Sequence, residues 1–224
     1  MAEKAKRMRY KAILFDLDGT LLDTLEDIGN AANRVLAENG FPTHDLDVYR
    51  YFIGEGAAWL ITRSLPEENR DKETILTCLN AFREDYGQNW NIKTKPYPGV
   101  AEMMNALTSR GLKMAILSNK PDDFTKQCAQ TLLATWTFDV VLGARDGVPR
   151  KPDPLSALEV AAHLKVAPSD FLYLGDSAVD MKTATAAGMF PVGALWGFRS
   201  ADELQEGGAR KLIGHPFEIL DCLG

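Results

Sequence analysis

This sequence has few cysteines, no long apolar run and no excess of positive charge, and each shortage excludes a class of protein. Cys78, Cys128 and Cys222 are widely spaced and form no C-x-x-C motif, so we expect neither a disulfide framework nor a zinc site. No stretch approaches about 18 consecutive apolar residues, which argues against a membrane-spanning helix. The first ten residues carry basic side chains but lack the apolar segment of a signal peptide. We therefore expect a cytoplasmic protein with no membrane partner.

Positive charge is also scarce. The 25 lysines and arginines are outnumbered by 31 aspartates and glutamates, which gives a formal net charge of −6. Nucleic-acid backbones bind clustered basic residues, so this balance argues against a nucleic-acid partner and favours a small-molecule substrate. The basic residues near the start are interpreted as a solvated tail: Lys4, Lys6, Arg7 and Arg9. With 46% hydrophobic residues in a chain of 224, the protein can bury its own core, and we expect a monomer or homodimer.

An acidic segment follows the first apolar run of the chain. Ala12-Ile13-Leu14 is typical of a buried strand, and it leads into Phe15-Asp16-Leu17-Asp18-Gly19-Thr20. Two carboxylates two residues apart on extended backbone can face the same side, where their repulsion is roughly 4 kcal/mol at an effective dielectric of about 20. A hard divalent cation such as Mg²⁺ would offset that cost. A turn with solvated acids explains the same residues equally well, and only the rest of the chain decides between them.

The next part of the chain has the spacing of helices. Apolar residues recur at helical intervals in three stretches, over 21–36, 57–65 and 75–86. Between them, 48–53 is short and aromatic, and Gly54-Glu55-Gly56 is a loop. Residues 93–99, with two prolines, have the composition of a hinge. We therefore predict a helical domain over 23–92, inserted into a core domain that consists of 1–22 and 93–224.

Beyond residue 99, helices and strands alternate. Helices are predicted over 100–107, 124–133, 155–164 and 181–187. Strands are predicted over 114–117, which stops at Ser118-Asn119, and over 138–142, 171–174 and 192–195, the last being the final strand. Residues 201–205 and 213–220 complete the chain. This alternation predicts an α/β protein with a parallel sheet.

Polar side chains occur in four places at the ends of these strands or in the loops that follow. They are Asp16 and Asp18, Ser118 and Asn119, Lys151, and Asp176 and Asp180. Each place by itself has a simple alternative explanation, as a helix cap or a solvated loop residue. Open α/β sheets bind ligands at the carboxyl ends of their strands, so four such groups at one edge indicate a functional site.

These residues resemble the four motifs of the haloacid dehalogenase-like phosphatases. Asp16-Leu17-Asp18-Gly19-Thr20-Leu21 is similar to the first motif, Ser118-Asn119 to the second, Lys151-Pro152-Asp153-Pro154 to the third, and Gly175-Asp176-Ser177-Ala178-Val179-Asp180 to the fourth. The motifs occur in order, and the insert resembles the small cap domain of that family, so the resemblance covers nearly the whole chain. Segments 51–56 and 196–198 are similar to the phosphoglycolate phosphatase subgroup, although they are less specific.

The resemblance implies a fold and an activity. The fold would be a Rossmann-like three-layer α/β core with a parallel sheet and an inserted helical cap domain. The activity would be hydrolysis of a small-molecule phosphate monoester, phosphoglycolate before others, through an aspartyl-phosphate. Asp16 would attack phosphorus. Asp18 would protonate the leaving oxygen and then take a proton from the hydrolytic water.

The other motif residues would balance charge in the same reaction. Phosphoryl oxygens would be held by Ser118, Asn119 and Lys151. The resemblance also implies an Mg²⁺ cofactor, bound by Asp16, Asp176 and the main-chain carbonyl of Asp18. Asp180 would act through water or from behind these ligands.

Choice of substrate is expected to depend on the insert, because the core motifs contact only the phosphoryl group. The backbone N–H groups of Gly54, Glu55 and Gly56 could bind the leaving group. A carboxylate could also meet an arginine of the insert, which offers Arg34, Arg50, Arg63, Arg70 and Arg83. Arg50 and Arg63 flank the glycine loop and are preferred. The alternative that both pair with surface acids is equally compatible with the sequence.

Other activities are weighed on the same residues. A phospho-accepting signalling module would need neither the insert nor a second acid beside the phosphorylated aspartate. An enzyme that cleaves carbon–halogen bonds would leave Asp18 with no group to protonate. A phosphonatase would need a Schiff-base lysine in the insert, where Lys72 lies in a charged, solvated run. A sugar-phosphate mutase uses the same core and stays open, whereas a catalytically inactive protein is disfavoured because every motif residue is present.

Overall fold

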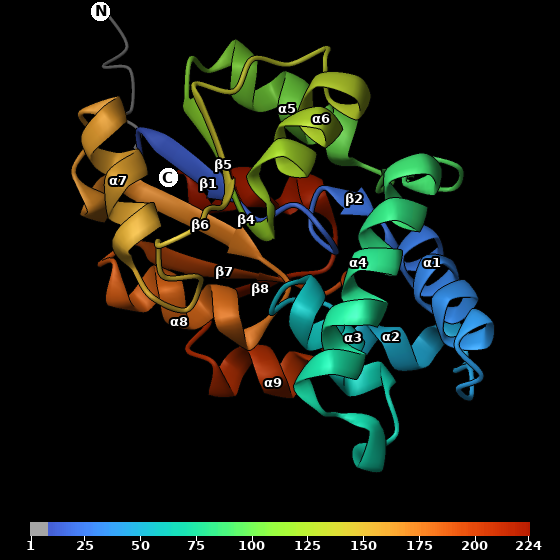
Figure 1. The fold of residues 1–224 in the computed structure, drawn as a ribbon. Coiled ribbons are helices and arrows are strands. Elements are labelled where there is room, and N and C mark those ends of the chain that lie inside the picture. The colour runs from blue at the N-terminus through green and yellow to red at the C-terminus, as the bar shows by residue number, and fades with distance from the viewer. Residues whose placement is uncertain (1–8) are drawn as a thin grey trace, which may run out of the picture.

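A six-stranded parallel sheet forms the centre of the computed structural model, which describes residues 9–224. The strand order is β5-β4-β1-β6-β7-β8, and every neighbouring pair is parallel (Figure 1). The strands are β1 Ala12–Phe15, β4 Lys113–Pro121, β5 Val140–Ala144, β6 Phe171–Gly175, β7 Phe190–Ala194 and β8 Lys211–Ile213. Because β1 lies inside the sheet, the chain delivers Asp16 to the middle of the sheet's carboxyl edge. The predicted tail residues Lys4, Lys6 and Arg7 lie outside the described residues.

Helices cover both faces of this sheet. Ile13 and Phe15 of β1 belong to one core cluster, with α5 and α6, whereas Ala12 and Leu14 belong to another, with α7 and α8. β1 is buried along its whole length because both of its faces are covered, and its sequence is therefore a continuous apolar run. The structure confirms the predicted three-layer α/β fold. These helices are α5 Val100–Ser109, α6 Asp122–Leu132, α7 Leu155–Leu164 and α8 Ala178–Ala186.

The insert is helical and lies beside the sheet (Figure 1). Ile28, Ala32 and Val35 are buried on one side of α1, and this helix makes extensive contact with α4. Asp71 caps α4, because its carboxylate accepts the N–H groups of Glu73 and Thr74. The helices are α1 Leu25–Glu38, α2 Leu46–Phe52, α3 Ala57–Ser64, the 3₁₀ helix η1 Glu67–Asn69, and α4 Lys72–Asn89.

Two short strands connect the insert with the core. β2 (Leu22–Asp23) and β3 (Lys95–Pro96) pair antiparallel, so the outgoing and returning connections run side by side. The buried carboxylate of Asp27 fixes the return, because it accepts hydrogen bonds from the Lys93 N–H and from both the N–H and the hydroxyl of Thr94. The predicted boundaries at 22/23 and 92/93 fall in or next to these connections. The division into two domains stays a prediction.

Besides shifts of two or three residues at some element ends, the structure differs from the expected elements at three places. The pattern from Leu21 predicts a helix, but α1 begins at Leu25 because Leu22 belongs to the connecting strand β2. The strand expected to stop at Ser118-Asn119 instead continues to Pro121, with a register shift after Leu117. The run 192–195 is not the final strand, because β8 follows it. β8 has three residues at the sheet edge, too few to give a periodic pattern.

The remaining elements lie near the end of the chain. They are the 3₁₀ helix η2 Pro168–Asp170, the helix α9 Ala201–Glu206 and the 3₁₀ helix η3 Pro216–Cys222. No helix within residues 9–224 is long and apolar enough to cross a lipid bilayer.

Candidate active site

The turn after β1 carries both predicted catalytic acids. Leu17 is fully buried, and its carbonyl accepts N–H groups of the following turn, which fixes the backbone between Asp16 and Asp18. Gly19 has a φ of 84°, and a Cβ there would overlap the carboxylate of Asp176. Glycine at this position therefore lets the first and fourth motifs approach each other.

Lys151 joins two carboxylates from different strand ends. Its ammonium lies 2.8 Å from an oxygen of Asp16 and 2.7 Å from an oxygen of Asp180, and it donates to the Leu117 carbonyl at 3.1 Å. Burial by itself would lower the pKa of Lys151, but the charges of Asp16 and Asp180 hold this pKa well above its ordinary value. The lysine is therefore cationic, and it places a positive charge between two carboxylates of the site.

Three buried acids converge beside this lysine. Oxygens of Asp16, Asp176 and Asp180 lie within 4.8 Å of one another. Burial, together with the charge of Asp180, raises the pKa of Asp176 to about 7. Burial, followed by the charge of Asp180, also raises the pKa of Asp16 well above its ordinary value. Carboxylate oxygens are the ligands that a hard divalent cation such as Mg²⁺ prefers. A cation bound here would offset the repulsion among these three acids and so favour their ionised forms.

Asp176 and Asp180 are held differently. Asp176 accepts hydrogen bonds from the Thr20 hydroxyl on one oxygen and from the Phe198 N–H on the other. Asp180 forms a capping box with Ser177 at the start of α8, and its remaining oxygen pairs with Lys151. Asp180 thus anchors the lysine. An oxygen of Asp180 also lies within 4.8 Å of oxygens of Asp16 and Asp176, and a role for Asp180 distinct from that of Asp176 stays a prediction.

The second motif contains one predicted phosphate-binding residue whose side chain is occupied elsewhere. The side-chain N–H₂ group of Asn119 donates to the carbonyls of Gly54 and Lys151, and its oxygen accepts the Lys151 N–H. No side-chain donor remains for a phosphoryl oxygen, so any such contact at this residue falls to its backbone. Ser118 is buried next to it and lines the same pocket as Asp16, with its hydroxyl accepting the Lys120 N–H.

Lys120 is a buried site residue that the sequence reasoning missed. Its ammonium lies 3.1 Å from the Asp18 carboxylate and 2.9 Å from the Tyr86 hydroxyl of α4, and it also lies 4.7 Å from the centre of the Tyr86 ring. Burial lowers the pKa of Lys120, but the Asp18 carboxylate, Tyr86 and Cys128 together outweigh this effect, and the net shift is upward. Its place directly after Ser118-Asn119 was the signal that could have identified it.

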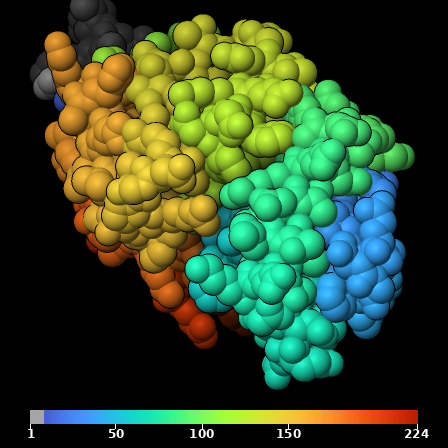
Figure 2. Space-filling view, in the orientation of Figure 1, coloured from blue at the N-terminus to red at the C-terminus, as the bar shows by residue number. Residues whose placement is uncertain are grey.

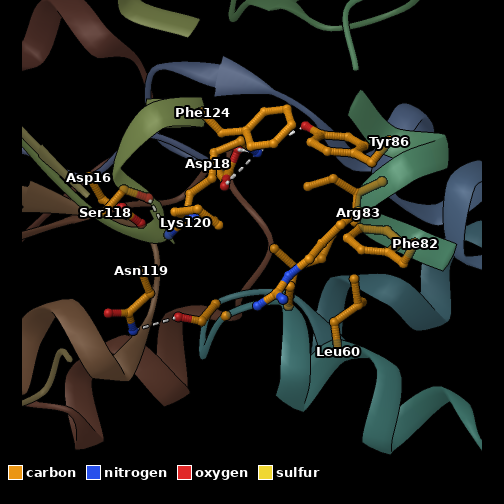
Figure 3. Close-up of a pocket in the computed structure, with 16 residues that line it drawn as sticks. Asp16, Asp18, Leu60, Phe82, Arg83, Tyr86, Ser118, Asn119, Lys120 and Phe124 are labelled. Atoms are coloured by element: carbon orange, nitrogen blue, oxygen red, sulfur yellow. Dashed lines mark hydrogen bonds and ion pairs between the residues drawn. The ribbon is translucent and has the colours of Figure 1, made fainter. Parts of the chain in front are cut away.

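A pocket lies between the strand ends and the insert (Figure 3). Asp16, Asp18 and Ser118 line its polar end. Its other walls are mostly apolar and come from both parts of the chain: Ile28, Ile53, Leu60, Phe82 and Phe124. Figure 2 shows helix α4, in green, directly against the yellow-green part of the core. Arg83 points from α4 into the pocket (Figure 3).

The glycine loop is attached to the core through its backbone. Asn119 binds the carbonyl of Gly54, the Arg150 guanidinium binds that of Glu55, and the Arg199 guanidinium binds that of Ile53. Gly54 and Gly56 have φ values of 124° and 95°, which side-chain-bearing residues rarely adopt. The predicted substrate residues Gly54 and Gly56 line the pocket.

The two preferred arginines do not face the pocket as free cations. Arg50 pairs with Asp47 at 3.1 Å and reaches the Gly197 carbonyl, and Arg63 pairs with Glu55. The preference for Arg50 and Arg63 as binders of a substrate carboxylate is therefore wrong, and pairing with nearby acids is what the structure shows. The Glu55 carboxylate is occupied by the same ion pair.

Comparison with known proteins agrees with this fold and site. The sequence profile of the haloacid dehalogenase-like hydrolases matches residues 13–194, and the chain belongs to that family. It is 32% identical to a phosphoglycolate phosphatase of Nitrosospira multiformis over 199 residues, with 88% of each chain covered. It is 35% identical to one of Xylella fastidiosa over 193 residues, with 86% of this chain and 83% of the other covered.

A solved structure gives the same result. A crystal structure from Lactobacillus delbrueckii subsp. bulgaricus, of a protein assigned as a phosphoglycolate phosphatase, superimposes with a TM-score of 0.90 at 30% identity. The match covers 96% of this chain and 98% of that one. The chain is thus a hydrolase of the haloacid dehalogenase-like family that is similar to phosphoglycolate phosphatases.

Proposed function

We propose that this protein hydrolyses a small phosphate monoester, with phosphoglycolate as the first candidate, through an aspartyl-phosphate on Asp16. The observation that carries this proposal is the position of Lys151, whose ammonium lies within 2.8 Å of Asp16 and at the same time contacts Asp180. A cation fixed beside a nucleophilic carboxylate reduces the electrostatic repulsion between that carboxylate and a phosphate dianion.

In the first step, an oxygen of Asp16 attacks phosphorus and the bond between phosphorus and the ester oxygen breaks. Asp18, in its protonated form, gives its proton to the departing oxygen, so the product alcohol leaves neutral. Lys151 and the Ser118 hydroxyl hold the phosphoryl oxygens while charge spreads over them. The products of this step are the alcohol and the acyl phosphate on Asp16.

In the second step, water attacks the same phosphorus and gives a proton to the Asp18 carboxylate. The bond between phosphorus and Asp16 breaks, inorganic phosphate leaves, and both carboxyl groups return to their starting states. Lys120 holds Asp18 at 3.1 Å, which supports a fixed position for this acid and base in both steps.

The acid cluster supports Mg²⁺ as the cofactor. We infer that Asp16 and Asp176 hold the ion, together with the main-chain carbonyl of Asp18, and that Asp180 stays bound to Lys151. When bound, Mg²⁺ supplies positive charge that neutralises a phosphoryl group. The glycines at 19 and 197 keep space beside Asp176, since a Cβ at either would overlap its carboxylate.

The relatives and the cysteines support a substrate and a cellular location. The names of the curated relatives support phosphoglycolate as the first ester to test. The cysteines form no disulfide in the described residues, which supports a reducing cytoplasm.

The test is release of inorganic phosphate from a panel of monoesters by the purified full chain, with Mg²⁺ or with a chelator. We expect release only with Mg²⁺. We also expect a ³²P-labelled acid-stable protein adduct in the wild type that is absent in Asp16→Asn. Near-native turnover by Asp16→Asn would overturn the covalent route. If no ester released inorganic phosphate, the proposed phosphatase activity would be overturned.

A further inference from the structure

We infer that Arg83 is the subsite that binds an anionic group, a carboxylate by preference, on the leaving group of the substrate. This inference rests on the proposed function and adds to it the residue that selects the ester. It starts from a difference among the arginines of the insert. Of the arginines in the insert, Arg83 alone combines an unpaired guanidinium with a position in the wall of the pocket.

Four of these arginines are already paired. Arg34 binds Asp85, Arg50 binds Asp47, Arg63 binds Glu55, and Arg70 lies 3.9 Å from Glu67 and donates to the Leu65 carbonyl. Within residues 9–224, the guanidinium of Arg83 has no carboxylate within 4.0 Å and no hydrogen-bond partner, and the residue is exposed. An arginine that lines a pocket without a partner is available to a ligand.

The position of Arg83 on α4 explains its free state. Helical neighbours lie three and four residues apart, and for Arg83 these are Leu79, Asn80, Tyr86 and Gly87, none of which is acidic. Glu84 and Asp85 are adjacent in sequence but project from other sides of the helix, and Asp85 is bound by Arg34. No acid of its own helix therefore competes with a ligand for this guanidinium.

The composition of the pocket defines the ligand that would fit. The polar end with Asp16, Asp18 and Ser118 takes the phosphoryl group, and the walls beyond it are apolar. The other cation lining the pocket, Lys120, is bound to Asp18 and Tyr86. A short carbon segment that ends in a carboxylate would place its charge near Arg83, and a planar guanidinium can bind two carboxylate oxygens at once.

The experiment compares two esters that differ in one group. Phosphoglycolate carries a carboxylate, and 2-hydroxyethyl phosphate carries a neutral hydroxymethyl group in its place. We expect the wild type to prefer phosphoglycolate in kcat/KM. Arg83→Leu should reduce that preference about 30-fold. The loss should appear mainly in KM, because Arg83 would bind the carboxylate equally well in the ground state and in the transition state. Arg83→Lys should keep the charge but recover only part of the preference.

Two further variants sharpen the test. Arg83→Glu should reverse the charge preference, so that phosphoethanolamine gains relative to phosphoglycolate. Arg70→Leu is the matched control, since Arg70 lies on the same insert but is paired outside the pocket, and it should leave the ratio of the two esters at the wild-type value. Thermal unfolding would verify that each variant is folded.

The possible failures are distinguishable. If the wild type releases phosphate from several esters but Arg83→Leu and Arg83→Glu change phosphoglycolate and 2-hydroxyethyl phosphate by the same factor, Arg83 does not select the leaving group. The inference is then overturned while the phosphatase stands. If a bisphosphate depends on Arg83 and phosphoglycolate does not, the carboxylate preference is overturned. If the wild type hydrolyses no ester, the proposed function itself has failed.

Discussion

The ammonium of Lys120 lies 3.1 Å from the carboxylate of Asp18. The same ammonium is 2.9 Å from the hydroxyl of Tyr86, which belongs to the insert. One lysine of the core thus connects the proposed acid and base with helix α4. Tyr86 in turn contacts Phe124 of α6 with ring centres 5.6 Å apart, so an aromatic contact lies beside the ion pair.

Replacing Lys120 by methionine removes this ion pair and keeps most of the side-chain volume. We expect kcat for phosphoglycolate to fall about 10- to 100-fold with a smaller change in KM, because Asp18 loses the group that holds it. With an activated aryl phosphate, aspartyl-phosphate should accumulate, since the first step then needs no acid but the second still needs a base. Lys126→Met is the control, because Lys126 is paired with Asp122 on the exposed side of α6. A change in KM alone would show that Lys120 binds substrate and does not position Asp18.

Lys151→Ala should lower kcat about 10²- to 10³-fold, because the positive charge is needed most where charge spreads in the transition state. Lys151→Arg should not restore the rate, since a planar fork cannot occupy the space that a compact ammonium fills between Asp16 and Asp180. Steady-state kinetics of both variants, with circular dichroism to verify folding, provide the measurement. An unchanged kcat with a raised KM would reassign Lys151 to substrate binding.

Stability of the metal-free protein should depend on pH through Asp176. The pKa of this carboxyl is raised from 3.8 to about 7 by burial and by Asp180, so the folded state holds a proton that the unfolded state releases. The contribution to stability is complete below the unfolded value and is lost as pH rises through about 7. Thermal unfolding in chelator should therefore show a lower Tm at pH 8 than at pH 5.

Magnesium should oppose this trend, because a bound cation favours the ionised carboxylates. We expect the rise in Tm on addition of Mg²⁺ to be larger at pH 8 than at pH 5. Asp176→Asn, which cannot ionise, should show a smaller pH effect and a smaller response to Mg²⁺. An Mg²⁺ response of the same size at both pH values would contradict the coupling between proton and metal at this cluster.

Asp27 should contribute to the stability of the connection between core and insert. Its carboxylate accepts hydrogen bonds from two N–H groups and one hydroxyl of residues Lys93 and Thr94. Asp27→Ala leaves these donors unsatisfied, and we expect a loss of about 2 to 3 kcal/mol in the free energy of unfolding. Glu26→Ala is the control, because Glu26 is an exposed acid next to Asp27 whose ion pair with the Lys93 ammonium is long at 4.0 Å. Equal effects of the two substitutions in urea unfolding would refute the role of Asp27.

The residues at the carboxyl edge of the sheet were accessible from the sequence. Asp16, Ser118 and Asp176 follow apolar runs, and parallel strands deliver such residues to one edge whatever the details of packing. Helix α7 was predicted with its observed bounds, Leu155–Leu164, because an apolar stretch with helical spacing lies between clear boundaries.

Contacts between distant side chains were not accessible. The ion pair of Lys120 with Asp18 and Tyr86 joins three segments whose distances depend on the docking of the insert. The partners of Arg50 and Arg63 are close in sequence, but nothing in the sequence says whether a surface arginine turns toward a local acid or toward a pocket. Asn119 had the same ambiguity, since an amide can bind a phosphate or three backbone groups equally well.

The core binds residues 53–55 of the insert through their carbonyl oxygens, by way of Arg199, Asn119 and Arg150. Every amino acid carries that carbonyl, so these contacts place no demand on the identity of the side chains that the insert presents. Apart from Gly54, whose positive φ value favours glycine, a single mutation at these positions leaves the carbonyl oxygens of the three hydrogen bonds in place. New substrate preferences can therefore evolve in this chain through a series of folded, docked intermediates, while the phosphoryl-handling residues of the core remain unchanged.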